Sequence, residues 1–130
     1  MVLVDYDSQL VTLPEILRLY LRNIDPLDAN GQFCDRGDSY RPVIFFKDES
    51  EENDAKNAIV AASNELQVPF ENISVELKSK GKFWLAEEYH QDFAERNELK
   101  YKFYRYSCGR DQRLDKLWKD NARSKNLWTE

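Results

Sequence analysis

The sequence predicts a mixed α/β fold, because short apolar runs with the composition of strands alternate along the chain with amphipathic segments of helical period. The chain has 130 residues, of which 42% are hydrophobic and 13% aromatic, enough to build one ordinary core. We therefore expect a single domain over residues 1–130 with a two-layer α+β architecture, in which helices pack on a mixed sheet.

The first elements are read from residues 1–26. Residues 1–7, MVLVDYD, have the composition of a strand that begins abruptly at the first residue. Thr12 and Glu15 have the spacing of a capping box, with Pro14 in the first helical turn. Apolar residues then recur at helical spacing as far as Ile24, which predicts a helix over 13–24 that ends near Pro26.

The middle of the chain predicts a strand, a helix and a second strand. Residues 42–46, PVIFF, are apolar, β-branched or aromatic, as in an interior strand. An alanine-rich stripe follows and predicts a helix that lies close to the sheet. Alternation of apolar and polar residues then predicts a strand over 73–77, followed by a glycine-centred turn over 78–82. The stripe consists of Ala55, Ala58, Ile59, Ala62 and Leu66.

Three further elements are expected in the last third. Residues 85–97 have helical character, and residues 101–106, YKFYRY, alternate weakly, which predicts a strand. The charged tail is expected to hold a short helix around Leu114, Leu117 and Trp118.

Charge and cysteine content exclude several classes of protein. The net charge is −5, and the 19 basic residues are scattered among 24 acidic ones, so we expect no nucleic-acid partner and no anionic membrane partner. No apolar run approaches the roughly 18 residues of a membrane span, and residues 1–20 do not resemble an export leader, which predicts a cytoplasmic protein. Cys34 and Cys108 are too few for a secreted disulfide scaffold, so we expect thiols in a reducing compartment.

Familiar cofactor and metal patterns do not occur in the sequence. There is no phosphate-binding loop, dinucleotide fingerprint or nucleophile-elbow serine. One histidine and two distant cysteines lack the paired spacing of a zinc site. We interpret His90 as a structural, hydrogen-bonded histidine.

The polar loop before the 42–46 strand holds the most chemistry. Asp35, Tyr40 and the flexible glycines Gly31 and Gly37 could gather hydrogen-bond donors and acceptors in one pocket. The alternative is a solvated loop with a capped turn. Cys34 precedes Asp35, whose negative charge opposes thiolate formation, so Cys34 is expected to be a poor nucleophile.

Three segments in this order resemble the peptide-methionine sulfoxide reductase A (MsrA) family: IDPLDANGQFCDRGDSYRPVIFF, LAEEYHQDF and YKFYRYSCGRDQRLDKLW. The resemblance implies a ferredoxin-type core and an enzyme that reduces the S epimer of methionine sulfoxide, in oxidised proteins or as the free amino acid, for protein repair under oxidative stress. It also implies thioredoxin as the partner that supplies electrons, and no cofactor.

The resemblance assigns roles to three residues. It implies that Tyr40 contacts the sulfoxide oxygen, that Asp35 orders the hydrogen bonds and water around it, and that Cys108 resolves the oxidised nucleophile into a disulfide. The EYHQ segment, with Tyr89 and His90, would form a supporting wall without a catalytic step.

The sequence departs from the family at its start. The family's glycine-cysteine-phenylalanine-tryptophan motif, which supplies the nucleophile, does not occur in residues 1–130, nor does the histidine-alanine-glutamate that supplies the general acid. We therefore expect a truncated member that lacks the family's N-terminal strand and helix, is inactive alone, and self-associates through uncovered sheet edges. Two alternatives stay open: a non-catalytic binding or assembly domain derived from MsrA, and an enzyme in which Cys34 has become the nucleophile.

Overall fold

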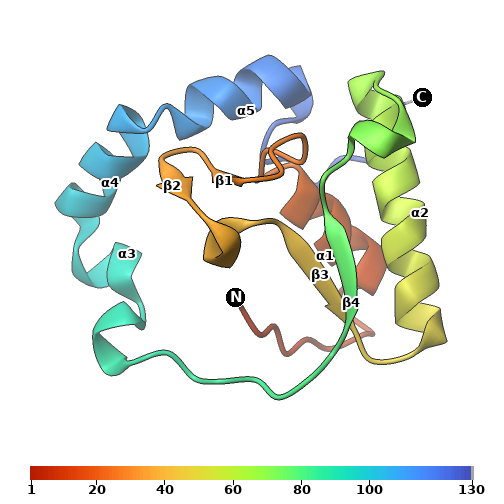
Figure 1. Ribbon diagram of the computed structural model, residues 1–130, viewed down its shortest axis with the longest axis horizontal. Helices are drawn as coiled ribbons and strands as arrows, with labels where there is room; N and C mark the ends of the chain where they lie inside the picture. The colour runs from red at the N-terminus through yellow and green to blue at the C-terminus, as the bar shows by residue number, and fades with distance from the viewer. Residues whose placement is uncertain (130) are drawn as a thin grey trace.

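The computed structural model describes residues 1–129 and confirms the mixed α/β class (Figure 1). Its central unit is a pair of parallel strands, β3 (Val43–Phe46) and β4 (Glu76–Ser79), joined by the long helix α2 (Glu49–Leu66). The register pairs Val43 with Glu76 and Phe46 with Ser79. Parallel strands need such a crossover, and a helix is its usual form.

Helix α1 (Leu13–Leu21) begins where the sequence predicts, and both α1 and α2 have side-chain caps. The Glu15 amide donates to Thr12 Oγ1 at 3.4 Å, and the Thr12 amide donates to the Glu15 carboxylate at 2.8 Å, so the capping box is confirmed. These hydrogen bonds hold the pKa of Glu15 below its ordinary value. The side chain of Asp48 caps α2 by accepting from the Glu51 amide at 2.9 Å.

The core lies where α1, α2, the β3–β4 pair and α5 (Arg110–Trp118) meet. The alanine-rich stripe of α2 is buried as predicted, and so are the apolar residues of α1 that face it. The Trp118 indole donates to the carbonyl of Ile24 at 3.1 Å, which fixes α5 against the end of the first helix. The buried apolar residues are Leu17, Leu21, Ile24, Ile44, Ala55, Ala58, Ile59, Ala62, Val75, Leu114 and Trp118.

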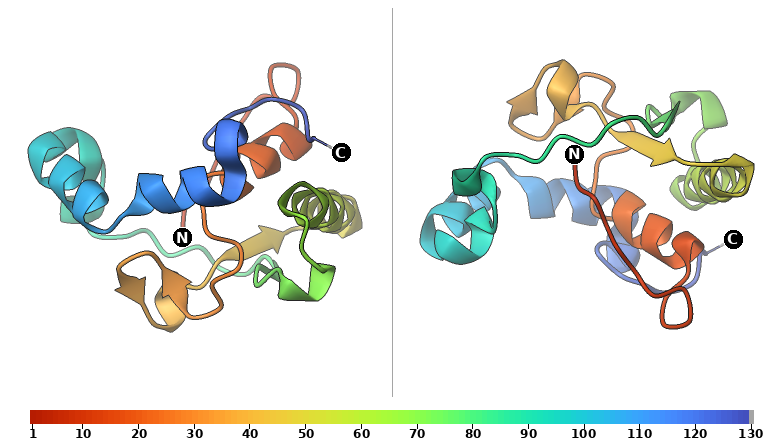
Figure 2. Two further views of the ribbon diagram at one scale, coloured as in Figure 1. Left: turned by 90° about the horizontal axis from the view of Figure 1, so that it is seen from above. Right: turned by 90° about the horizontal axis from the view of Figure 1, so that it is seen from below.

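The last third of the chain is helical. After β4 the chain runs through a 3-10 turn (Glu88–His90) into α3 (Phe93–Arg96), α4 (Glu98–Ser107) and α5. In all three views α3 and α4 lie at the opposite end of the molecule from α2, with α5 between them (Figures 1 and 2). Among residues 1–129, no helix has the length and apolar character needed to cross a membrane.

Two predicted strands and one predicted helix were wrong. Residues 1–7 form no strand in the structure, because a strand needs a hydrogen-bonded neighbour and Met1 and Val2 are 78% and 86% exposed. Residues 101–106 belong to helix α4, since the half-buried Tyr101, Arg105 and Cys108 recur at helical spacing. The predicted helix over 85–97 is reduced to a 3-10 turn and α3, and the backbone at Asp92 between them is left-handed, with φ 51°.

The boundaries of two other elements differ from the prediction. Helix α1 ends at Leu21, three residues before the predicted end at Ile24, with Arg22 as its C-cap. Strand β4 starts at Glu76, because a 3-10 turn (Phe70–Asn72) precedes it and the Ser74 amide donates to the Pro26 carbonyl at 2.7 Å. The predicted mixed sheet is wrong for residues 1–129, where the strands form a parallel pair, β3–β4, and a separate antiparallel pair of β1 (Gly31–Gln32) and β2 (Asp35–Arg36).

Arg22 is the largest side chain that is fully buried. Its guanidinium pairs with Glu65 of α2 at 2.6 Å, and the Glu65 side chain is only 5% exposed. The same group donates to the Asn126 carbonyl at 2.5 Å and to the Leu127 carbonyl at 3.1 Å. It also lies 4.8 Å from the centre of the Trp128 ring. One arginine therefore joins α1, α2 and the C-terminal segment.

We expect Arg22→Met to lower the free energy of unfolding by about 3–5 kcal/mol, because it leaves the Glu65 carboxylate buried without its partner. Urea denaturation followed by circular dichroism measures the change. Arg96, whose side chain is 55% exposed, provides the matched control, and Arg96→Met should cost less than about 0.5 kcal/mol. Equal effects of the two substitutions would contradict the central role of Arg22.

Candidate functional site

The polar loop forms a small hairpin of β1 (Gly31–Gln32) and β2 (Asp35–Arg36), which are antiparallel. A side chain at Gly31 would place its Cβ 2.2 Å from the carbonyl oxygen of Asp35, so the two strands can approach only because residue 31 is glycine. Phe33, in the turn between the strands, has left-handed backbone with φ 54°. This conformation is unfavourable for a bulky residue and needs support from contacts elsewhere in the fold.

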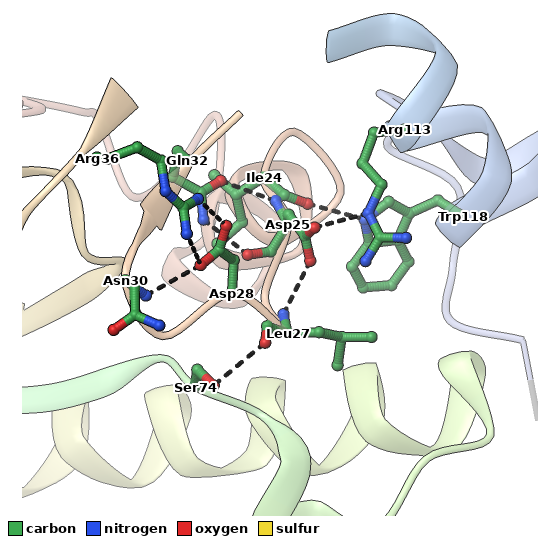
Figure 3. A network of polar contacts seen from close by, with 10 residues as sticks. All are labelled: Ile24, Asp25, Leu27, Asp28, Asn30, Gln32, Arg36, Ser74, Arg113 and Trp118. Carbon is green, nitrogen blue, oxygen red and sulfur yellow. Dashed lines mark hydrogen bonds and ion pairs between the residues drawn. The ribbon is translucent and has the colours of Figure 1, made fainter. Parts of the chain in front are cut away.

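Part of that support comes from a network around Asp25, which is 6% exposed (Figure 3). The Asp25 carboxylate accepts from Arg113 of α5 at 2.6 Å and from the Leu27 amide at 3.0 Å. The Asp25 backbone exchanges two hydrogen bonds with the Gln32 side chain, at 2.8 and 2.7 Å. The hairpin is therefore fixed to both the end of α1 and the middle of α5.

A second pair of charges stabilises the same loop (Figure 3). Arg36 forms a bidentate ion pair with Asp28, and this interaction holds the pKa of the Asp28 carboxyl below its ordinary value. A recess of about 320 Å³ lies beside these charges. Its carboxylates are already paired with Arg36 and Arg113, so we do not assign it the chemistry of the site.

A disulfide joins the tip of the hairpin to the C-terminal end of α4. Cys34 and Cys108 are 74 residues apart in sequence, and their Cα atoms lie 5.3 Å apart. The expectation of two separate thiols is therefore wrong for this structure. The sequence could not reveal this bond, because it depends on the end of α4 lying against a hairpin that is 74 residues earlier in the chain.

Asp35 lies next to this disulfide and accepts a hydrogen bond from the phenol of Tyr104. Loss of solvent around the hydroxyl and the contact with the Asp35 carboxylate raise the pKa of Tyr104 to about 12. The positive charge of Arg110 opposes this rise, and the phenol of Tyr40 adds to it. The bond uses Oδ2 of Asp35 and leaves Oδ1 without a protein partner among residues 1–129.

The hairpin tip, α4 and the start of α5 enclose a recess of about 200 Å³. Arg110 lies over the ring of Phe33, 4.5 Å from its centre, and so covers the strained turn. Arg105 is held by Asp111, at 2.6 and 2.9 Å, and by the Tyr101 hydroxyl at 3.2 Å. The recess is lined by Phe33, Asp35, Tyr101, Tyr104, Arg105, Cys108 and Arg110.

The structure brings together two of the three predicted site residues at this recess. Asp35 and Cys108 line it, whereas Tyr40 lies in the 3-10 turn η1 (Asp38–Tyr40), half exposed and close enough to influence Tyr104. His90 is in an exposed turn with Nε2 3.7 Å from the Glu87 carboxylate, so it is not the hydrogen-bonded structural histidine that we expected. Residues 1–129 contain no group of three or more histidine, cysteine or acidic side chains arranged to hold a metal ion.

Sequence reasoning missed Tyr101, Tyr104, Arg105 and Arg110. A signal was present in YKFYRYSC, where Tyr104 and Cys108 are four residues apart and so share one face of a helix. A strand would also put Tyr104 and Cys108 on one face, but roughly 13 Å apart. It would place Tyr101 and Tyr104 on opposite faces, so this interpretation hides the grouping.

Comparison with known proteins agrees with the motifs at this site. The model of the family described as peptide methionine sulfoxide reductase matches residues 1–122. The chain belongs to the peptide methionine sulfoxide reductase family. The matched residues include the whole hairpin, helix α4 and both cysteines.

Curated members of this reductase family show the same likeness. Peptide methionine sulfoxide reductase MsrA 2 of Rhizobium meliloti is 41% identical over 119 residues, which cover 92% of this chain and 59% of the relative. MsrA of Listeria monocytogenes serotype 4a is 37% identical, over 89% of this chain and 65% of the relative. The MsrA/MsrB protein of Vibrio cholerae is 38% identical over 88% of this chain and 30% of the relative. The chain thus spans less than two thirds of the length of these relatives.

We expect the Tyr104 phenol to ionise at unusually high pH. Its folded-state pKa of about 12 exceeds its ordinary value of 10.0, so the neutral phenol stabilises the fold. This stabilisation is complete below pH 10.0 and is lost as the pH rises toward 12. A titration followed by phenolate absorbance should show that Tyr104→Phe has one fewer tyrosine ionising near pH 12 than the wild type. Identical late titration in wild type and variant would contradict the assignment.

Proposed function

We propose that this chain takes part in the reduction of methionine sulfoxide, supplying the residues that surround the sulfoxide oxygen and the thiol that resolves the oxidised enzyme. The single observation that supports this most is the convergence of Asp35 and Cys108 at one recess in a member of the reductase family. The S epimer, free or within oxidised proteins, is the proposed substrate, and thioredoxin is the proposed reductant. No resident cofactor is needed, because thiols can carry both electrons.

The proposed reaction has three steps. A cysteine thiolate attacks the sulfoxide sulfur, the oxygen is protonated and transferred to that cysteine as a sulfenic acid, and methionine is released. The Cys108 thiol then condenses with the sulfenic acid and releases water, which leaves a disulfide. A dithiol reductant opens this disulfide and is itself oxidised to a disulfide.

Two groups suit the first step. The Tyr40 phenol can donate a hydrogen bond to the sulfoxide oxygen, and the free Oδ1 of Asp35 can accept one from water or from a protonated oxygen. The phenol can donate to the developing negative oxygen in the manner of an oxyanion site, whereas the Asp35 carboxylate can only accept, from an ordered water or from the oxygen once it is protonated.

We do not assign the nucleophile to either cysteine of residues 1–130. Cys34 precedes the carboxylate of Asp35, which disfavours a thiolate, and in this structure Cys34 and Cys108 are bonded to each other. We propose that the nucleophile and the general acid belong to another segment, which would complete a ferredoxin-type core and a single MsrA-like domain. A cytoplasmic location would keep the two cysteines reducible.

Residues 1–130 alone should therefore give no turnover of a methionine S-sulfoxide peptide with dithiothreitol. Joined to the part of the Rhizobium MsrA 2 that precedes its matched segment, they should give turnover measured by release of methionine peptide. In that chimera, Asp35→Asn and Tyr40→Phe should each lower kcat/KM by about 100-fold or more, because each removes a group next to the reacting oxygen.

The control variant is Tyr106→Phe, at an exposed position on α4, which should leave kcat/KM within a factor of about 2. A folded chimera without activity would contradict the proposal. Turnover by residues 1–130 alone that disappears in Cys34→Ser would instead make Cys34 the nucleophile.

Cys108→Ser in the active chimera should stop recycling while sparing the first turnover, because the sulfenic acid would have no intramolecular thiol to meet. Rapid-quench measurement should show one methionine released per enzyme, followed by no steady state with thioredoxin. Ser107→Ala, one residue earlier and exposed, is the matched control and should recycle normally. Undiminished recycling in Cys108→Ser would show that another cysteine resolves the intermediate.

The alternative function is a non-catalytic binding or assembly domain. Large apolar side chains exposed on the first residues and on α4 favour this reading, since such groups are common at protein interfaces. The same surfaces support the proposed self-association of the chain. On residues 1–7 and on α4, the most exposed of these side chains are Met1, Val2, Leu99, Phe103 and Tyr106, at 73–86%.

A further inference from the structure

The hairpin and helix α4 are joined at two neighbouring points. The disulfide connects Cys34 to Cys108, and the hydrogen bond connects Asp35 to Tyr104. Cys34 and Asp35 are adjacent in the hairpin, and Tyr104 and Cys108 lie one turn apart on α4. The disulfide and the hydrogen bond therefore both connect the hairpin to α4. Each holds α4 at the distance from the hairpin at which the other can form.

Arg105 joins α4 to α5 through its ion pair with Asp111, and apolar packing adds little to hold α4 in place. None of its residues is fully buried, and Leu99 and Phe103 are 85% and 73% exposed. A helix that buries so little of its side-chain surface gains little stability from packing against the rest of the protein. The position of α4 next to the hairpin consequently depends strongly on the disulfide and on the Tyr104 hydrogen bond.

We propose that the Cys34–Cys108 disulfide is a redox switch for the Asp35 carboxylate, with Tyr104 as the positioning residue that holds this carboxylate in the oxidised state. The proposal rests on the proposed function, in which Asp35 serves the sulfoxide oxygen. In the oxidised chain Asp35 is bound to Tyr104 and Cys108 is unavailable as a thiol. In this state neither the Asp35 carboxylate nor the Cys108 thiol is available for the reaction.

Reduction releases them together. A dithiol transfers two electrons and two protons to the disulfide, which becomes two thiols, and the reductant becomes a disulfide. Without the covalent link, α4 loses one of its two ties to the hairpin, and the Tyr104 hydrogen bond weakens. Asp35 is then free to turn toward a substrate in the state in which Cys108 is ready to resolve the enzyme.

Coupling of this kind is reciprocal. If the disulfide strengthens the hydrogen bond, the hydrogen bond must make the disulfide harder to reduce by the same factor. Residues 1–130 are therefore equilibrated with mixtures of reduced and oxidised dithiothreitol at pH 7, and thiols are trapped and counted by mass spectrometry. The comparison includes wild type, Tyr104→Phe, Asp35→Asn and the double variant.

We expect Tyr104→Phe to shift the equilibrium toward the thiols by about fivefold, the size expected from one partly exposed hydrogen bond to a charged group. In the Asp35→Asn background, Tyr104→Phe should cause almost no further shift, because its partner carboxylate is already gone. The matched control is Tyr106→Phe, since Tyr106 lies on the same helix and is 74% exposed. It should leave the equilibrium unchanged.

A second readout follows the phenol itself. Cys34→Ser prevents the disulfide and should move the pKa of Tyr104 down from about 12 toward its ordinary value of 10.0. Tyrosine labelled with ¹³C at Cζ reports this ionisation by nuclear magnetic resonance.

Two results would overturn the proposal: a shift in Tyr104→Phe no larger than in Tyr106→Phe, or full additivity of the Tyr104 and Asp35 substitutions. Neither measurement needs substrate or turnover. A failed reductase assay would therefore count against the proposed function alone, and absence of coupling would count against the switch alone.

Discussion

The buried guanidinium of Arg22 is the constraint on which the arrangement of the chain depends. A fully buried cation must be paired and hydrogen-bonded, and Arg22 meets this requirement through Glu65 of α2 and carbonyls of the C-terminal segment. Three parts of the chain that are distant in sequence must therefore assemble around one side chain. The polar loop starts only three residues later, at Asp25, so the position of Arg22 also sets where the candidate site begins.

The contacts that position the candidate site become weaker with distance from Arg22. Asp25 anchors the loop to α5 through Arg113, an interaction inside the well-packed half of the molecule. The hairpin then reaches α4, which packs thinly and is held by the Cys34–Cys108 disulfide and by Tyr104. A rigid core beside a weakly packed helix suits the proposed exchange of thiol bonds, because the parts that would rearrange lie outside the core.

The recess combines a neutral hydrogen-bond donor, the Tyr104 phenol, with an acceptor, the Asp35 carboxylate. Loss of solvent around the Tyr104 hydroxyl and the neighbouring Asp35 carboxylate both raise the pKa of this phenol, while Arg105 is paired with Asp111 and Arg110 lies over the face of Phe33. The family match spans residues 1–122, and within them the contacts bring Asp35 and Cys108, two residues of the sequence motifs, to one recess.

The sequence by itself determined the local features of this protein. Helices α1 and α2 are capped by Thr12, Glu15 and Asp48 through contacts within four residues. The helical period of the alanine-rich stripe is enough to predict the buried face of α2. The motifs around Asp35 and Cys108 were sufficient to identify the family.

Only the tertiary structure decided the features that need distant partners. Residues 1–7 have strand composition but no neighbouring strand to pair with, and YKFYRY is a helix because Tyr101, Arg105 and Cys108 turn one face toward the hairpin. The bonds from Cys34 to Cys108 and from Tyr104 to Asp35 span 74 and 69 residues, so no local pattern could specify them. Such contacts form only when the core around Arg22 brings both ends together, and their physical origin lies in packing that a single segment does not encode.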